Sequence, residues 1–339
     1  MKIIRIILGA VVALAVSAAA GLWAYLSFAG DEPHFAGTCD VLNLDESAED
    51  IQIDRERGLA YLSLIDRMSL AKGEAVQGWI GRLDLNAAVP TVEPALIDPP
   101  DHFRPHGISL RIEPEGSRSL FVINHPLERG VGPELIELFA EERPGRFRHV
   151  RTFADELITS PNDLVAVGPG QFYVANDDGK RAKLVYIDGD RGRAVADDIN
   201  SGGGINVSAD GRTLYVAETG GQSIRIMRRD PTDGGVETIN TIPIGTSPDN
   251  IDIADDGSLW IGAHSNVVAL VMHFIMGATA PSQILRMDAD ADGNAAFEEI
   301  YLNRGDEIPA SSVGATYGKK LLIGSITARK VLICTMGSG

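Results

Sequence analysis

The sequence predicts an all-β fold, a six-bladed β-propeller with an N-terminal transmembrane helix. The first observation is a phrase that recurs six times: polar residues, a β-rich stretch, a Gly-containing turn and a second apolar stretch. The turns hold Gly58, Gly116, Gly170, Gly211, Gly257 and Gly318, about 40 to 60 residues apart, as expected of propeller blades. The second observation is that helix patterns are scarce after the N-terminus. Equivalent positions in a closed propeller converge on one axis, so the repeat also predicts a site.

Residues 1–30 are expected to form a membrane anchor or signal-anchor segment. Lys2 and Arg5 precede an uncharged stretch, residues 6–30, which is long enough to span a bilayer. A cleaved signal peptide would have a shorter apolar stretch, although the small residues 18–20 could form a cleavage site. Positive charges before the span predict a membrane-anchored protein whose propeller, residues 31–339, lies on the periplasmic or extracellular side.

The composition limits the class of partner. The chain has 339 residues, 44% of them hydrophobic, which is enough to bury a large core in one propeller. The net charge of −17 disfavours nucleic acid, whose phosphates need a basic face. It suits cation binding, and it is equally explained by simple solubility.

The only two cysteines, Cys39 and Cys334, stand at the two ends of the predicted propeller. A propeller brings its first and last strands into the same blade, so a disulfide between them would close the ring. Only one pairing exists, and an exported compartment allows it. The alternative is two unpaired buried thiols.

Two stretches lie outside the repeated phrase. The apolar run Val267–Met276 ends at Gly277 and predicts a short helix on the face of the propeller. Its apolar side could contact a membrane, a substrate, a second subunit or the chain's own surface. An oligomeric state is therefore one of the possibilities. Residues 67–78 are polar and contain glycine, which predicts a mobile loop near the tunnel mouth.

One acidic stretch matches the spacing of an EF-hand loop, with Asp288, Asp290, Asp292, Gly293 and Glu299. An EF-hand needs flanking helices, whereas residues 283–287 and 297–301 have the pattern of strands. An acidic β-turn, with at most weak surface calcium binding, is therefore predicted.

Polar pairs open three of the six repeats: Glu49-Asp50, Asn162-Asp163 and Asp249-Asn250. Carboxylate and amide oxygens suit a hard cation such as Ca²⁺. Adjacent strand residues point opposite ways, so the pairs could hold two ions at different depths of the tunnel. For a single pair, turn capping by Asp or Asn is the alternative, but three pairs in register with the repeat favour a cation site.

Two histidines are candidate catalytic residues. His106 opens the second repeat, and His125 follows the next predicted strand, so both imidazoles could reach the same rim. One could remove a proton from water while the other orients it. The alternative is a pair of hydrogen-bonded rim histidines. No Gly-x-Ser-x-Gly motif is present, which disfavours a serine hydrolase.

Together these motifs resemble the paraoxonase/arylesterase family of calcium-dependent lactonases. The matching segments, in chain order, are Glu49-Asp50, Pro105-His-Gly-Ile-Ser109, Asn124-His-Pro126, Pro161-Asn-Asp163, Ile205-Asn206, Asp249-Asn250 and Leu321-Leu-Ile-Gly324. The resemblance runs from about Cys39 to Cys334. It implies a six-bladed propeller that holds one catalytic and one structural Ca²⁺ and hydrolyses lactones and aryl esters.

The resemblance also implies roles for single residues. The implied ligands of the catalytic calcium are Glu49, Asn162, Asp249 and Asn250. Those of the structural calcium are Asp50, Asp163 and the carbonyl of Ile108. His106 and His125 match the family's histidine pair, which activates water, and His264 matches a histidine in the wall of the substrate pocket.

The chain departs from the family pattern in the fourth repeat. The family has an Asn calcium ligand where this chain has Gly203, and water or Asn200 could supply the missing oxygen. The departure motivates an alternative, a catalytically weak, calcium-stabilised binding propeller. Whether Gly203→Asn raises calcium affinity and activity together is the observation that discriminates between the two hypotheses. A related propeller with sugar-lactonase activity is a third hypothesis, and the histidine pair argues against it.

Overall fold

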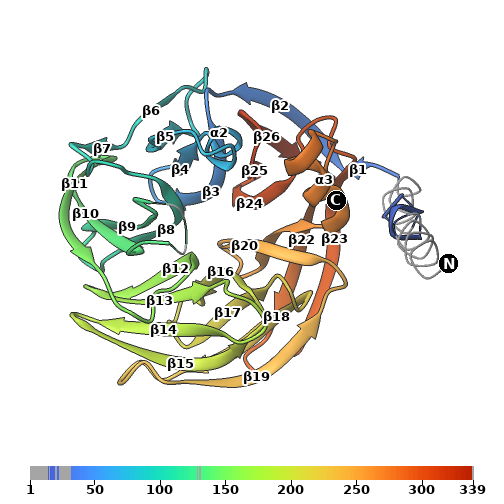
Figure 1. Ribbon diagram of the computed structural model, residues 1–339. Helices are drawn as coiled ribbons and strands as arrows, with labels where there is room; N and C mark the ends of the chain where they lie inside the picture. Colours follow the sequence, from blue (N-terminus) through green and yellow to red (C-terminus); the bar gives the residue numbers. More distant parts are fainter. Residues whose placement is uncertain are drawn as a thin grey trace.

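The computed structural model is a closed ring of six sheets, each built on four antiparallel strands (Figure 1). The structure describes residues 14, 16–19, 21–22, 32–127, 129 and 131–337. Most of the expected anchor, residues 1–30, lies outside this range. Within the described range, no helix has the length and apolar character needed to cross a membrane, so the expected transmembrane helix finds no support in the structure.

Blades 1 to 3 follow one another along the chain. Blade 1 contains β3 (Ser47–Asp54), β4 (Leu59–Ile65), β5 (Trp79–Asp84) and β6 (Val92–Pro94). Blade 2 contains β8 (Pro105–Ile112), β9 (Arg118–Asn124), β10 (Leu135–Arg143) and β11 (Arg146–Phe153), with the short parallel β7 (Leu96–Ile97) at its edge. Blade 3 contains β12 (Pro161–Gly168), β13 (Gln171–Asn176), β14 (Ala182–Asp188) and β15 (Arg191–Ile199).

Blades 4 to 6 complete the ring. Blade 4 contains β16 (Gly202–Val207), β17 (Thr213–Glu218), β18 (Ser223–Arg229) and β19 (Val236–Pro243). Blade 5 contains β20 (Ser247–Ile253), β21 (Leu259–His264), β22 (Ser282–Ala289), β23 (Ala295–Asn303) and the edge strand β1 (His34–Phe35). Blade 6 contains β24 (Ser311–Tyr317), β25 (Lys320–Ser325), β26 (Lys330–Met336) and, outermost, β2 (Gly37–Asn43).

The two ends of the propeller meet in blade 6. Strand β2 pairs with β26 and sets Cys39 opposite Cys334, and the two form a disulfide. The predicted bridge is therefore confirmed, and the alternative of two free thiols is wrong. Because the crosslink joins residues 295 positions apart, it removes much of the conformational freedom of the unfolded chain.

The repeated phrase corresponds to the two innermost strands of each blade. All six turn glycines adopt positive φ, between 58° and 87°, a region that side-chain-bearing residues avoid. Apolar residues of these strands pack between neighbouring blades in six clusters; Ile51, Leu62 and Leu322, for example, join blades 1 and 6. Each fully buried aliphatic or aromatic side chain contributes about 1.5–3 kcal/mol to folding.

Every innermost strand has an irregular register near its start. The shifts fall between Ala48 and Ile51, Pro105 and Ile108, Pro161 and Asp163, Gly202 and Ile205, Pro248 and Ile251, and Ser311 and Val313. A bulge interrupts strand pairing and re-aims side chains. The residues inside these six bulges therefore face the axis, and they include most of the predicted site residues.

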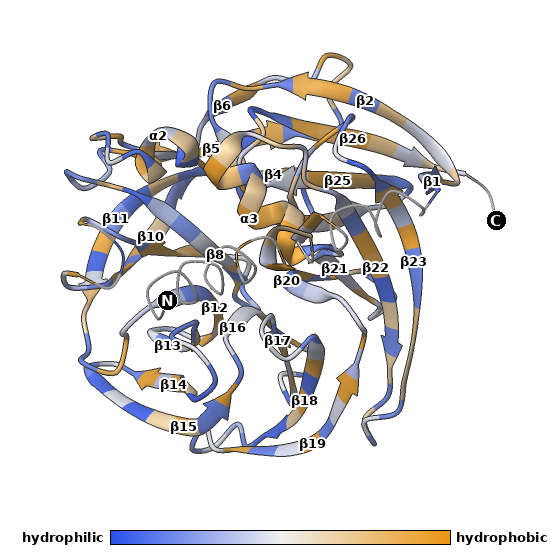
Figure 2. Cartoon of the chain, turned by 45° about the vertical axis from the view of Figure 1, so that its right-hand side comes forward, coloured by the Kyte–Doolittle hydropathy of each residue, from blue (hydrophilic) through white to orange (hydrophobic). Residues whose placement is uncertain are grey.

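Within the described part of residues 32–337, helices α2 and α3 lie outside the sheets. The expectation of a mobile loop over residues 67–78 is wrong in part, because α2 (Arg67–Ala71) forms there, with the Asp66 carboxylate accepting a hydrogen bond from the Ser69 amide. The predicted helix α3 (Val267–Met276) is confirmed, capped by Asn266 and ended by Gly277 in the left-handed conformation. Figure 2 shows α3 as a largely apolar element over the face of the ring.

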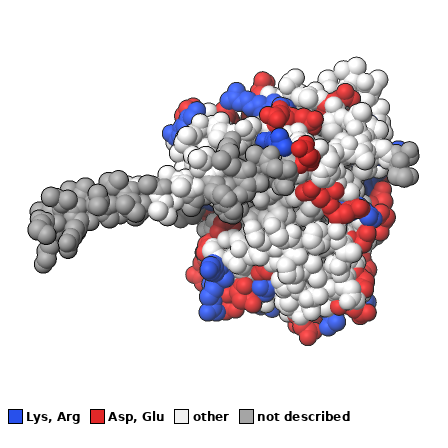
Figure 3. Space-filling view, turned by 90° about the vertical axis from the view of Figure 1, so that its right-hand side faces the viewer, with Lys and Arg blue, Asp and Glu red and all other residues white. Residues whose placement is uncertain are grey.

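The acidic stretch that resembles an EF-hand loop is a turn between β22 and β23, as predicted. The Asp290 carboxylate accepts hydrogen bonds from the backbone of Asp292 and Asn294, which closes the turn. On the face shown in Figure 3, carboxylates lie mostly towards the margins, with basic side chains among them.

Candidate functional site

A cavity of about 1070 Å³ lies at the end of the tunnel where the innermost strands begin. Its lining combines bulge residues of the innermost strands with residues of both helices and of loops between strands. The residues that line the cavity include Glu49, Arg67, His106, His125, Arg129, Asn162, Asp177, Thr219, Asp249, His264, Val267, Leu270 and Phe274.

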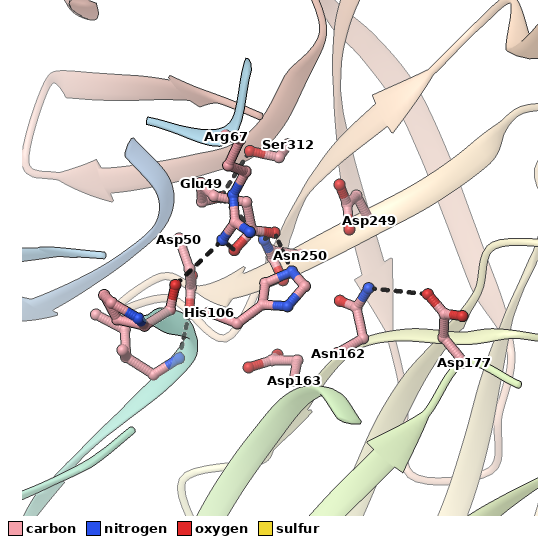
Figure 4. Close-up of polar contacts among 12 residues, drawn as sticks. Glu49, Asp50, Arg67, His106, Asn162, Asp163, Asp177, Asp249, Asn250 and Ser312 are labelled. Carbon is pink, nitrogen blue, oxygen red and sulfur yellow. Dashed lines mark hydrogen bonds and ion pairs between the residues drawn. The ribbon is translucent and has the colours of Figure 1, made fainter. Parts of the chain in front are cut away.

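Glu49 is the most connected carboxylate of the site. It is buried, and its Oε1 accepts a hydrogen bond of 2.9 Å from Asn250 Nδ2, while its Oε2 lies 3.5 Å from Arg67 Nη2. Burial alone raises the pKa of Glu49, but the neighbouring His106 and Arg67 outweigh it and lower that pKa to about 2. Figure 4 shows these groups gathered near the axis.

Asp50 and Asp163 form a deeper pair that ties blades together. Each accepts a hydrogen bond from the next amide of its own strand. Each also accepts a bond of 2.8 Å from a neighbouring blade, Asp50 from the Ile108 amide and Asp163 from the Ile205 amide. Burial raises the pKa of both carboxyls, and repulsion from Glu49 and between the two adds to the rise. A cation between them would relieve that repulsion.

The donor set fits a hard cation. Asn162 Oδ1 and Asn250 Oδ1 are buried oxygens with no hydrogen-bond partner, while their amide groups donate to Asp177 and Glu49. Unpaired buried oxygens near carboxylates are the ligands that Ca²⁺ takes. Within the described residues, no three His, Cys, Asp or Glu side chains gather into a metal site by themselves, so a cation here would need these amide oxygens.

The structure brings the two predicted histidines into contact. His106 Nδ1 lies 2.9 Å from His125 Nε2, and both rings are buried. Burial, only partly opposed by Glu49, lowers the pKa of His106 to about 3. Burial also lowers the pKa of His125. Both imidazoles are therefore neutral near pH 7, the state in which a histidine can accept a proton.

His264 stands on the opposite wall of the cavity. Its Nε2 lies 3.1 Å from Asp249 Oδ2, and its Nδ1 is buried without a partner. Burial raises the pKa of Asp249, and the hydrogen bond and charge of His264 act in the opposite direction. His264 is thus placed in the pocket wall, where its free nitrogen can meet a polar group of a ligand.

The fourth blade differs from the rest because its bulge holds Gly203 and Gly204, which have no side chains. A Cβ at Gly203 would lie 2.5 Å from Thr219 Oγ1, so the Thr219 hydroxyl occupies that space. This hydroxyl donates a bond of 2.7 Å to the Pro248 carbonyl and keeps its lone pairs. Asn200, the substitute expected from the sequence, has its amide oxygen beside Gly220 instead.

Sequence reasoning missed three groups of this site: Arg67, Thr219 and Glu134. Arg67 lies on the helix that was expected to be a loop, and Thr219 follows an outer strand of its hairpin. Glu134 precedes β10 and contacts His125 Nδ1 through its carboxylate. A single acid before an apolar strand is common, so no sequence signal distinguishes Glu134.

Three comparisons with known proteins agree with this geometry. A family profile described as Arylesterase matches residues 38–180 and 178–336. Serum paraoxonase/arylesterase 2 of Homo sapiens is 31% identical over 69% of each chain. Serum paraoxonase/lactonase 3 of Rattus norvegicus is 29% identical over 87% of this chain and 88% of that protein.

Solved structures match in fold alone. A luciferin-regenerating enzyme superimposes with a TM-score of 0.53 at 13% identity, covering 89% of this chain and 98% of the other. Regucalcin of Agrobacterium tumefaciens, a calcium-binding protein, gives 0.52 at 15% identity over 90% and 96% of the two chains.

Proposed function

The chain belongs to the arylesterase family, and from that premise we propose that it is a calcium-dependent hydrolase of lactones and aryl esters. Its relatives are named as arylesterases and lactonases, which supports hydrolase activity in general. The single observation that carries the finer proposal is the buried His106–His125 contact in the same site as the unpaired oxygens of Asn162 and Asn250.

The proton-handling group in this proposal is His106, which lines the cavity. Its neutral ring accepts a proton from water as the water oxygen attacks the substrate carbonyl carbon. His125 holds the ring of His106 in place through the contact of 2.9 Å. Arg67 keeps Glu49 charged and fixed, so the polar wall needs little rearrangement during the reaction.

Glu49, Asn162, Asp249 and Asn250 would hold the catalytic calcium, and Thr219 offers a further oxygen in the fourth blade. Asp50, Asp163 and the Ile108 carbonyl would hold the structural one. When bound, the catalytic ion supplies positive charge for the carbonyl oxygen of the substrate.

The far wall of the cavity suits the apolar part of an ester. Val267, Leu270 and Phe274 of α3 line it, opposite the histidines. A substrate with its carbonyl at the polar wall would place an acyl or aryl group against α3. This arrangement supports small lactones and aryl esters as the substrate class.

The test is hydrolysis of a panel of aliphatic lactones and phenyl acetate by the purified chain. The proposal predicts turnover that stops when a chelator removes the metal and returns with Ca²⁺. Unchanged turnover in protein shown to be free of metal would refute the calcium mechanism. Hydrolysis confined to sugar lactones would favour the related sugar-lactonase class.

The glycines of blade 4 favour a second candidate, a weakly catalytic binding propeller held together by calcium. Because Thr219 fills the space next to Gly203, Gly203→Asn alone would clash, and the informative variant is Gly203→Asn with Thr219→Ala. If calcium affinity and turnover rise together in this variant, the fourth blade limits an enzyme. A rise in affinity without any turnover favours the binding propeller.

The proposal includes export and membrane attachment. Residues 6–30 carry no charge and follow Lys2 and Arg5. The disulfide of blade 6 supports this location, because such crosslinks persist in oxidising compartments. Protease protection of the propeller in intact cells, lost on lysis, is the expected result; a cytosolic propeller would refute it.

A further inference from the structure

We propose that Glu134 is a positioning residue that fixes the direction of the proton chain through His125 and His106, so that His106 presents an unprotonated Nε2 to the cavity. The inference rests on the proposed function for its chemistry. It assigns Glu134, His125 and His106 to one relay that runs from a buried carboxylate to the cavity wall.

The contacts of the relay form a continuous line. Glu134 is buried, with 5% of its surface exposed, and its Oε2 contacts His125 Nδ1. His125 Nε2 then lies 2.9 Å from His106 Nδ1. On the cavity side, His106 Nε2 lies 3.6 Å from Glu49 Oε1. Four groups therefore leave three gaps in which a proton can be shared.

Counting protons decides which gap is empty. Two neutral imidazoles carry two N–H protons for three gaps, and an ionised carboxylate can only accept. The Glu134–His125 contact is the closest of the three and the gap to Glu49 is the widest. With the two closer gaps filled, His125 carries its proton on Nδ1 and His106 on Nδ1. His125 Nε2 accepts the hydrogen bond from His106 Nδ1, so the one unprotonated nitrogen that accepts no proton from within the relay is His106 Nε2, which faces the cavity.

The other three arrangements are worse. A proton on His106 Nε2, with His125 still bonded to Glu134, would set two bare nitrogens 2.9 Å apart. Moving the protons to His125 Nε2 and His106 Nε2 would set the bare Nδ1 of His125 against the Glu134 carboxylate. Both juxtapose lone pairs in a buried site, which is costly. Protons on His125 Nε2 and His106 Nδ1 would instead set two N–H groups against each other at 2.9 Å. Both rings are buried, which favours the neutral state that the count assumes.

The relay gives the reaction a balanced proton path. As the water oxygen bonds to the ester carbonyl carbon, its O–H bond breaks and the proton moves to His106 Nε2. The positive charge that develops on the histidine pair is stabilised by Glu134. When the bond to the leaving alkoxide breaks, the same proton passes to the alkoxide oxygen and His106 is neutral again. No oxidant, reductant or further reactant is needed.

Blade 2 offers a matched control, the buried carboxylate of Glu137. It accepts hydrogen bonds from Asn124 Nδ2, at 2.9 Å, and His149 Nε2, at 2.8 Å. Neither His106 nor His125 contacts it through a hydrogen bond in the described structure. Glu137→Gln therefore removes a buried charge from the same sheet without touching the relay.

The experiment combines ¹⁵N NMR of the histidines with kinetics on the full chain. In the wild type, the expected signal is a neutral His125 with its proton on Nδ1. In Glu134→Gln, we expect a mixture of His125 tautomers and a kcat lowered on the order of 10–100-fold with little change in KM. Glu134→Asp, which keeps the charge, should recover part of kcat. Glu137→Gln should leave the His125 tautomer and the kcat of the folded protein near wild type.

Two results would overturn the proposal. One is a wild-type His125 that carries its proton on Nε2, a measurement that needs neither a folded variant nor an active enzyme. The other is a folded Glu134→Gln protein with unchanged tautomer and kcat. A wild type that hydrolyses nothing but shows the Nδ1 proton would refute the proposed function and leave the relay geometry intact.

Discussion

The two walls of the cavity share the same backbone bulges but carry different side chains. Blades 1 to 3 and blades 4 to 6 carry the same bulge at the start of each innermost strand. In the first wall the bulges hold Glu49 and His106, whose side chains lie 3.6 Å apart, and Asn162, which donates a hydrogen bond to Asp177. In the second wall blade 4 holds only glycines, and α3 adds apolar side chains. The repeat thus determines where side chains meet, and the side chains determine what each wall does.

This comparison predicts that changes to the first wall lower turnover, whereas changes to the second alter binding. The largest expected effect is that of His106→Gln, which removes the proton acceptor and should lower kcat by about 10²–10⁴-fold. The fold should survive because Gln fills most of the space. His149→Gln, in the same blade but outside the cavity, is the control. A kcat equal to that of the wild type would remove His106 from the mechanism.

Metal removal should affect both walls, because the oxygen donors come from each. Calcium at 100 times its Kd stabilises the fold by about 2.7 kcal/mol. Chelation should therefore lower Tm by several degrees, and Ca²⁺ should restore it. An identical Tm with and without the metal would show that no calcium site stabilises the propeller.

The pH profile tests the first wall alone. A base must be neutral to act, and burial lowers the pKa of His106 to about 3 and that of His125 in the same direction. The pair therefore stays neutral as pH falls through the ordinary histidine range, and activity is lost only below it. The acid limb of kcat should lie under pH 6.5, and a limb at or above that value would contradict a buried neutral pair.

The smallest effect is expected from the apolar side of the second wall. Phe274→Ala removes a cavity-lining ring that is 38% exposed, which should raise KM for esters with long apolar groups about fivefold. Its kcat should change little. Ile275→Ala, on the same helix but 72% exposed and outside the cavity lining, is the control. An equal change in KM in both variants would show that the cavity-facing side of α3 does not bind the substrate.

The repeated phrase was sufficient to predict the propeller, because turn glycines with positive φ and flanking apolar strands are local features. The closing disulfide and α3 followed from the same local patterns. The repeated pattern also predicted that His106 and His125 could meet, since neighbouring strands place them at one rim. What the residues do in this site stays a prediction until it is measured.

The remaining parts depend on contacts that no local pattern records. Thr219 lies beside Gly203 within the hairpin of blade 4, and its hydroxyl reaches the Pro248 carbonyl only because blades 4 and 5 pack together at that point. Glu134 meets His125 across a loop whose path the sequence leaves open. Arg67 was assigned to a loop because five residues are too few to give a clear helical period.

The most direct test of the account is a calcium titration of metal-free protein, with bound calcium and phenyl acetate hydrolysis measured in the same samples. We predict that the rate rises in proportion to calcium bound at the tunnel, and that His106→Gln binds the same calcium while its rate stays low. Full hydrolysis before calcium binds, or a wild-type rate in calcium-loaded His106→Gln, would contradict the claim that calcium and His106 act together in one site.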